Sequence, residues 1–118
     1  MATYAPLLLS GSTDGDPIIV VATATAGTLI HTAVSGTTSW DEVYLWVSNV
    51  TATAATLTIE WGGVTDPGSH MCKALSIPAN SPPIPVVTGV RLNNGGVIRA
   101  FSGTASALNI TGNVNRIT

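Results

Sequence analysis

Cys72 is the only cysteine of the 118-residue chain, and His70 stands two positions before it. Residues two apart on a β-strand point to the same side, so this pair could act as a nucleophile with its general base. Such chemistry also needs an acid that orients the histidine, and the sequence places none at a recognisable spacing. We therefore interpret the pair as a surface histidine beside a half-buried cysteine, with no catalytic role.

A metal site is the second chemistry that these residue types could support. His31, His70 and Cys72 together still lack a fourth ligand, and their spacing matches no paired-cysteine zinc pattern. Asp14-Gly15-Asp16 resembles the start of a calcium loop, but the later carboxylates and the closing glutamate are missing. The sequence predicts neither a metal ion nor a cofactor.

Paired carboxylates, which hydrolyse glycosidic bonds, need two acids held apart across a cleft. Asp41 and Glu42 are adjacent and therefore diverge to opposite faces of a strand. Asp66 lies in an Asp-Pro-Gly turn, where its side chain is best interpreted as a turn cap. Because no acid, base and nucleophile converge, we predict that the protein is not an enzyme and has no catalytic residues.

Aromatic residues form the fourth group. Tyr44 and Trp46 share a face at strand spacing and could form a platform on which a sugar ring lies. The alternative is that Trp61 and one of these rings pack between two sheets, as large rings commonly do. Few polar side chains nearby look placed to bind sugar hydroxyls, and both interpretations remain open from the sequence.

The chain carries very little charge. Charged residues make up 8% of it, against about 25% in an average soluble domain, and the net charge is −2. Nucleic-acid binding and electrostatic membrane binding both need clustered lysine or arginine, which the sequence lacks. A surface of Thr, Ser, Ala, Gly and Asn costs little to desolvate, so the composition favours a protein that assembles with others.

Hydrophobic alternation with a period of two predicts an all-β fold. Val43, Leu45 and Val47 share one face of a strand, and no window has helical spacing. About eight short strands at hairpin spacing predict an antiparallel two-sheet β-sandwich, similar to a jelly roll, over residues 17–118. Asn93-Asn94-Gly95-Gly96 is the clearest hairpin turn. The stretch 78–85 is too rich in proline for a central strand.

Residues 1–16 are expected to form an extended N-terminal arm outside the core. Pro6, Gly11 and Gly15 interrupt this segment, which carries an apolar group made of Tyr4, Leu7, Leu8 and Leu9. These side chains can be buried in a groove of the chain's own body or on a neighbour, where they would form a capsid-contact or assembly arm. We expect the sandwich to fold without the arm.

Thr56, Thr58 and Glu60 alternate with Leu57, Ile59 and Trp61 along another predicted strand. Their face is small, polar and almost uncharged. We predict that this face is covered by another copy of the chain, with Glu60 at a rim where water remains.

Four stretches of the sequence resemble a known family. They are GTLIHTAVSGTTSWDEVYLWVSNV from Gly27, LTIEWGGVTDP, IPANSPPIPV and VIRAFSGTASALNITGNVNRI. They resemble small proteins encoded among the head genes of tailed bacteriophages, which are capsid decoration (cement) or head-fibre proteins. The family has no catalytic motif. The resemblance implies a β-sandwich that forms homotrimers and binds the major capsid protein on the outer surface of the phage head.

The N-terminus lacks a basic region and a long apolar run, which predicts synthesis in the host bacterial cytoplasm rather than secretion. The expected function is therefore a virion structural protein that stabilises a phage capsid, with neither nucleic acid nor membrane as a partner. The alternative is a host- or carbohydrate-binding adhesion module of a phage fibre, tail or baseplate, acting through Tyr44 and Trp46.

Overall fold

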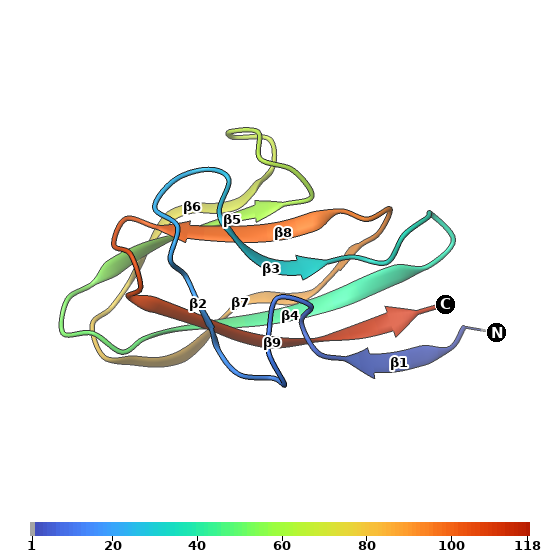
Figure 1. Ribbon diagram of the computed structural model, residues 1–118, viewed down its shortest axis with the longest axis horizontal. Coiled ribbons are helices and arrows are strands. Elements are labelled where there is room, and N and C mark those ends of the chain that lie inside the picture. The colour runs from blue at the N-terminus through green and yellow to red at the C-terminus, as the bar shows by residue number, and fades with distance from the viewer. Residues whose placement is uncertain (1) are drawn as a thin grey trace.

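A computed structural model describes residues 2–118, and over this range the chain is all-β with two antiparallel sheets packed face to face (Figure 1). The strands are β1 (Tyr4–Leu7), β2 (Ile18–Ile19), β3 (Thr28–Thr32), β4 (Trp40–Asn49), β5 (Ala55–Trp61), β6 (His70–Ile77), β7 (Ser81–Leu92), β8 (Val97–Ser102) and β9 (Leu108–Ile117). The predicted two-sheet sandwich is confirmed. These residues include no helix that could cross a membrane.

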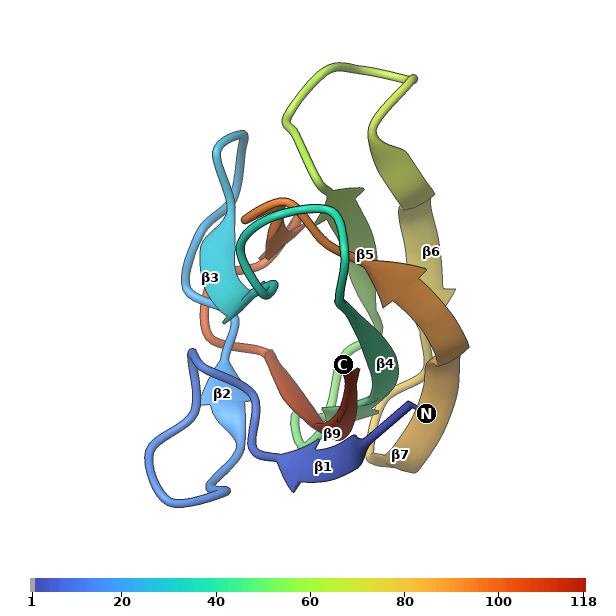
Figure 2. The same cartoon turned by 90° about the vertical axis from the view of Figure 1, so that its right-hand side faces the viewer.

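The strand pairs are nested around the hairpin formed by β5 and β6. β5 pairs with β6, β4 with β7, β3 with β8, and β2 with β9, all antiparallel. The result is one sheet ordered β1-β9-β4-β7, with β2 also on β9, and a second ordered β3-β8-β5-β6. A long hairpin rolled up in this way is a jelly roll, and from β2 onward every connection except the β5–β6 hairpin crosses from one sheet to the other (Figure 2).

The alternation along β4 sets the core as predicted. Val43, Leu45 and Val47 are fully buried between the sheets. Leu108, Ile110 and Val114 of β9 are buried against the same core. Burial of each such side chain stabilises the fold by roughly 1.5–3 kcal/mol.

The proline-rich stretch lies where prolines are tolerated in a sheet. β7 begins at Ser81, earlier than expected, and includes Pro82, Pro83 and Pro85. It is the edge strand of its sheet and pairs with β4 alone, so the missing proline N–H groups interrupt no ladder on the open side. The prediction that this stretch is not a central strand is correct.

The turn at residues 93–96 forms, but the hairpin predicted from it is wrong. Asn94 and Gly95 have φ angles of 56° and 68°, as expected for this turn chemistry. β7 and β8 nevertheless belong to different sheets. The turn is held by the loop between β3 and β4, because Asn94 N donates to Gly36 O and Gly95 N to Val34 O. The turn therefore connects a strand of one sheet to a strand of the other.

The N-terminal segment lies on the chain's own body, which corrects the expectation of an arm outside the core. β1 pairs with β9 along Leu7–Val114 and Tyr4–Ile117, and Leu9 is buried in the core. Next, Gly11 N donates to Ile30 O and Thr32 N donates to Ser10 Oγ. Residues 10–11 thus cover the open edge of β3, a common protection against unwanted strand pairing.

We predict that Leu9→Ala lowers the free energy of unfolding by about 3 kcal/mol, because it leaves a cavity in the core. Leu75→Ala on β6, away from this segment, is a matched control. Leu75 is 43% exposed and Leu9 only 2% exposed, so the control should change stability little. Urea titration of both variants measures the difference, and equal stabilities would show that the segment is the detachable arm expected from the sequence.

Candidate functional site

His70 and Cys72 lie on β6, the edge strand of the β3-β8-β5-β6 sheet. The Cys72 thiol donates to the Leu57 carbonyl at 3.7 Å, and burial raises the pKa of this thiol above its usual value. A raised pKa disfavours the thiolate, which is the nucleophilic form. The arrangement agrees with the interpretation of a half-buried cysteine.

His70 differs from the surface histidine that we expected. Its side chain is buried and packs edge-on against Phe101, with ring centroids 6.2 Å apart. Neither ring nitrogen has a hydrogen-bond partner within residues 2–118, and Asp66 Oδ1 is 3.5 Å from Nδ1. His31 is on β3, at the opposite edge of the sheet, so the structure does not bring the two histidines together. The described residues hold no group of three or more potential metal ligands.

Thr56, Thr58 and Glu60 do not form the open polar face that we predicted for contact with another copy. Glu60 is fully buried and accepts hydrogen bonds from Thr25 Oγ1 at 2.5 Å and from Gly27 N at 2.7 Å. Gly27 lies so close to β8 that a Cβ there would overlap the Ala100 backbone. The loop 22–27 therefore covers this carboxylate with the chain's own backbone, and Glu60 marks no wet rim.

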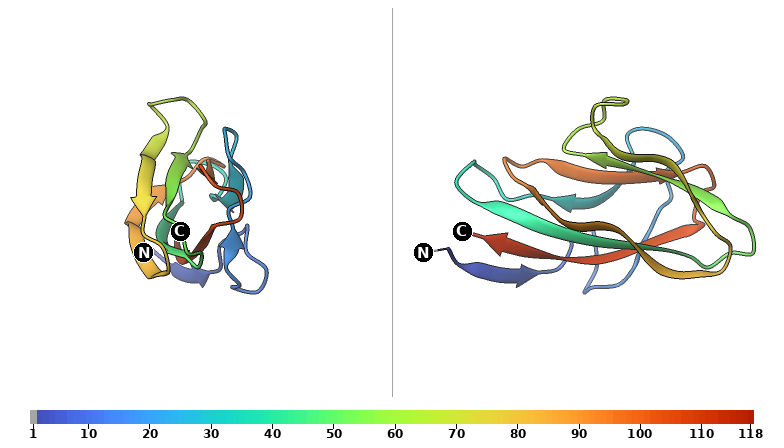
Figure 3. Two further views of the ribbon diagram at one scale, coloured as in Figure 1. Left: turned by 90° about the vertical axis from the view of Figure 1, so that its left-hand side faces the viewer. Right: turned by 180° about the vertical axis from the view of Figure 1, so that it is seen from behind.

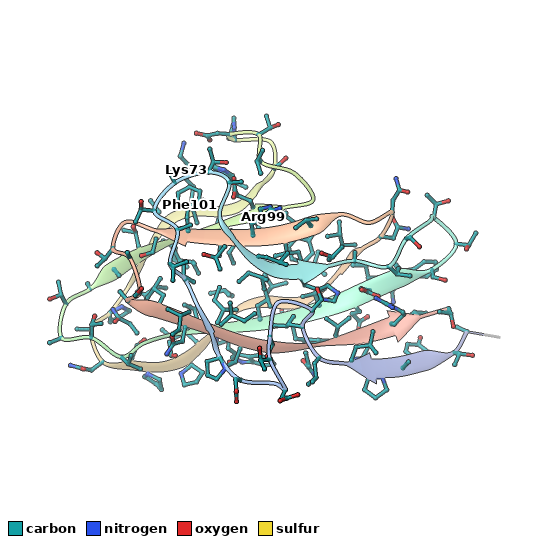
Figure 4. All side chains as sticks on the ribbon, viewed as in Figure 1. Lys73, Arg99 and Phe101 are labelled. Carbon is teal, nitrogen blue, oxygen red and sulfur yellow. The ribbon has the colours of Figure 1, made fainter. Side chains whose placement is uncertain are left out.

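The two threonines of this face are also engaged within the chain. Thr58 is buried, and its Oγ1 accepts a hydrogen bond from Ala74 N. Thr56 Oγ1 accepts one from Gly103 N. Figure 4 shows Arg99 and Phe101 on the same outer side of this sheet, where Arg99 Nη1 donates to Gly27 O. Thr58 and Glu60 are therefore engaged within the chain, and Glu60 is buried rather than at a wet rim.

A buried polar cluster at one end of the sandwich was not predicted. Asp41 is fully buried and accepts hydrogen bonds from Arg116 Nε at 2.8 Å, Arg116 Nη2 at 3.0 Å and Val34 N at 3.2 Å. Its Oδ2 also lies 2.7 Å from His31 Nε2. The signal available in the sequence was the position of Asp41, two residues before Val43 on the inward face of β4.

The hydrogen bonds of His31 define its tautomer. Ser10 N donates to His31 Nδ1 at 3.0 Å, so Nδ1 carries no proton. The proton of the neutral ring then lies on Nε2 and is donated to Asp41. His31 thus links the N-terminal segment to the Asp41 carboxylate, and the cluster fastens β3, β4, β9 and residue 10 together.

The outer side of the β1-β9-β4-β7 sheet carries the rings proposed as a platform. Tyr44 and Trp46 point away from the core, since Val43, Leu45 and Val47 fill the inward positions. Their ring centroids are 6.5 Å apart and their planes differ by 19°. Trp61, by contrast, packs partly buried against the core. The structure therefore places Tyr44 and Trp46 on the outer side of the sheet and Trp61 against the core, an assignment that the sequence left open.

β9 supplies the polar neighbours that sequence reasoning missed. Its outward positions hold Asn109, Thr111, Asn113 and Asn115. The register places Asn113 directly opposite Tyr44 and Thr111 opposite Trp46. The alternation of these residues was visible in the sequence, but their position beside β4 depends on a pairing between distant segments. We call this surface, made of Trp40, Tyr44, Trp46 and the four β9 residues, the aromatic face.

A shallow cavity of about 310 Å³ lies at the end of this face, lined by Trp40, Arg91, Leu92 and Asn93. The guanidinium carbon of Arg91 lies 5.6 Å from the centre of the Trp40 ring, a cation–π contact. Arg91 Nε also pairs with Glu42 Oε2 at 3.4 Å. Trp40 Nε1 has no hydrogen-bond partner among the described residues.

Comparisons of the chain with protein-family models, with curated proteins and with solved structures gave no match. The resemblance to phage decoration proteins therefore stays a prediction.

The Asp41 cluster predicts a loss of stability in acid. Burial raises the pKa of Asp41, but hydrogen bonds from Arg116 and His31 outweigh burial and hold that pKa below its ordinary value of 3.8. The folded state thus binds this proton less readily than the unfolded chain. The resulting stability is present above about pH 4 and is lost as the pH falls through the folded pKa.

We predict that Asp41→Asn lowers the free energy of unfolding at neutral pH by about 3 kcal/mol, because Arg116 loses its charged partner. The gap between variant and wild type should narrow as the pH falls below 4. The exposed Asp66→Asn, which weakens a surface pair with Lys73 and a 3.5 Å contact with His70, is the control and should change stability little, since Asp66 itself is half exposed. Denaturant titrations from pH 7 to pH 3 measure this; a gap that does not change with pH would contradict it.

Proposed function

We propose that the protein is a non-enzymatic virion structural protein, which forms homotrimers and decorates the outside of a phage head as a cement protein. The observation that carries this proposal is a group of exposed apolar side chains on one side of the sandwich. It consists of the exposed side chains Leu8, Ile19, Val21 and Leu29, which we call the N-terminal flank. Its partners would be other copies of the chain and the major capsid protein.

The flank lies along one side of the molecule. β2 and β3 lie on this side, while β6 and β7 follow each other along the opposite side (Figures 2 and 3). No Asp, Glu, Lys or Arg occurs between Asp16 and Asp41, the stretch that forms β2 and β3. Interfaces between proteins are depleted of charge at their centres, so this composition suits contact with a partner.

The few charged side chains of the protein are mostly bonded within the chain. Arg116 pairs with Asp41, Arg91 with Glu42 and Lys73 with Asp66. Glu60 and Arg99 bond to the loop 22–27. Within residues 2–118 only Asp14 and Asp16 keep side chains without such a bond. The surface therefore carries fewer unpaired charges than the composition suggests. Few unpaired charges mean weak repulsion between copies, which supports assembly over a dispersed monomer.

The mechanism of a cement protein requires modest contacts repeated many times. A trimer joins one patch of each subunit to a different patch of the next, and the ring closes after three copies. Many trimers on one shell then bind through combined weak contacts rather than through one deep pocket. Jelly rolls occur in viral capsid domains and also in lectins, so the fold is compatible with this role without defining it.

We predict that Val21→Lys lowers the oligomer mass of the protein and its binding to heads, because it places a charge in the flank. Val50→Lys is the matched control, since Val50 is 67% exposed and Val21 57%, and Val50 lies in the β4–β5 loop. Sedimentation equilibrium measures the mass, and co-sedimentation with phage heads measures attachment. A wild-type protein that is monomeric and never sediments with heads would exclude the proposed function.

A further inference from the structure

We propose that the aromatic face binds a neutral oligosaccharide, which lies along β4 from Trp46 toward the cavity beside Trp40. This site goes beyond the assembly function and does not depend on it, because a decorating protein needs no saccharide. Three features carry the inference: a pair of nearly parallel rings, a row of unengaged polar side chains, and a cavity at one end.

The Tyr44 ring is held in place. Tyr44 OH donates to Glu42 Oε1 at 2.9 Å, and this hydrogen bond raises the pKa of Tyr44 above its ordinary value. Gly89 on β7 makes room for the ring, since a Cβ there would lie 3.1 Å from the hydroxyl oxygen. Two nearly parallel rings on a sheet offer apolar surface to the C–H side of a sugar ring, and because the Tyr44 ring is already held in place, little of its entropy is lost on binding.

The β9 side chains supply hydrogen bonds beside the rings. Asn113 and Thr111 stand directly opposite Tyr44 and Trp46, at the distance of a cross-strand pair. Asn115 and Asn109 extend the row in both directions, opposite Glu42 and Ser48. None of these four side chains is hydrogen-bonded to another of residues 2–118. Amides and hydroxyls both donate and accept, as the hydroxyl groups of a saccharide do.

The cavity extends the site along the strand. Trp40 lies six residues before Trp46 on the same side of β4, which corresponds to about 20 Å of strand. That span fits an oligosaccharide rather than a single sugar. Arg91, which lies over Trp40, is 53% exposed and held to Glu42 by a 3.4 Å contact, so its side chain can adjust at low cost.

The charge of the face selects the class of ligand. Glu42 and Arg91 are the ionised side chains beside the rings, and they neutralise each other. A nucleic acid also stacks on aromatic rings, but it needs several convergent cations for its phosphates. Arg116, the nearest alternative on β9, is committed to Asp41. A neutral ligand with apolar faces and many hydroxyls matches both the rings and the amides.

The test uses the full-length protein and a panel of neutral hexasaccharides, namely β-glucan, galactan and chitin fragments, with sialylated oligosaccharides and a six-nucleotide thymidine strand as comparison ligands. Tryptophan fluorescence and calorimetry measure binding. We expect at least one neutral hexasaccharide to bind, with an affinity that falls about tenfold in Trp46→Ala, as loss of a ring contact predicts. Met71→Ala, an exposed apolar change on the other sheet, should bind as wild type.

Asn113→Ala tests the same site if Trp46→Ala lowers stability. The Asn113 side chain is exposed, so its removal leaves the core intact. We expect about a fivefold loss of affinity from one missing hydrogen bond, with an unchanged melting temperature. Binding of the thymidine strand alone, or of no saccharide, would overturn the proposal. A Trp46→Ala variant that loses oligomer mass without any saccharide binding would overturn it too, since the face would then be a protein interface.

Discussion

The nesting of strand pairs around the β5–β6 hairpin is the constraint on which the other features depend. Once β4 pairs with β7 and β3 with β8, the chain ends must meet, and β2 comes to lie on β9. β4 and β9 are then neighbours inside one sheet, and their ten-residue ladder brings the rings and the amides together. The aromatic face is therefore a consequence of topology, because neither strand could form it alone.

The buried Asp41 cluster links elements that the nesting places in different sheets. Its carboxylate bonds β9 through Arg116 and β3 through His31, and His31 in turn holds Ser10. A buried carboxylate is costly unless its oxygens are satisfied, and here four donors satisfy them. The requirement explains why residues 4–11 follow the body of the molecule although proline and glycine interrupt them.

The sequence predicted those features of the fold that depend on neighbouring residues, such as the alternation within a strand. The buried faces of β4 and β9 followed from a period of two, and the missing proline N–H groups correctly excluded the proline-rich stretch as a central strand. Glu60 was placed wrongly, because a charged residue alternating with threonine looks exposed until the loop 22–27 is seen to cover it. The turn at Asn94 was correct in conformation and wrong in partner, since turn chemistry does not choose the strand that pairs next. The burial of Leu9 was missed for a similar reason, as the path of residues 4–7 that leads to it depends on pairing with the distant β9.

The two sheets consequently present different outer surfaces. The outer side of β3-β8-β5-β6 is partly covered by the chain's own loops, with Glu60 and Thr58 bonded inside. The outer side of β1-β9-β4-β7 keeps its rings and amides without such cover. The N-terminal flank lies between the two, on the side of β2 and β3 (Figure 2). In the proposed assembly, the flank meets the aromatic face where Ile19 lies opposite Asn109, while the rings lie on β4, beyond β9. A subunit held by the flank would then keep its rings in contact with solvent, so attachment to a particle and recognition of a saccharide are geometrically compatible in one small domain.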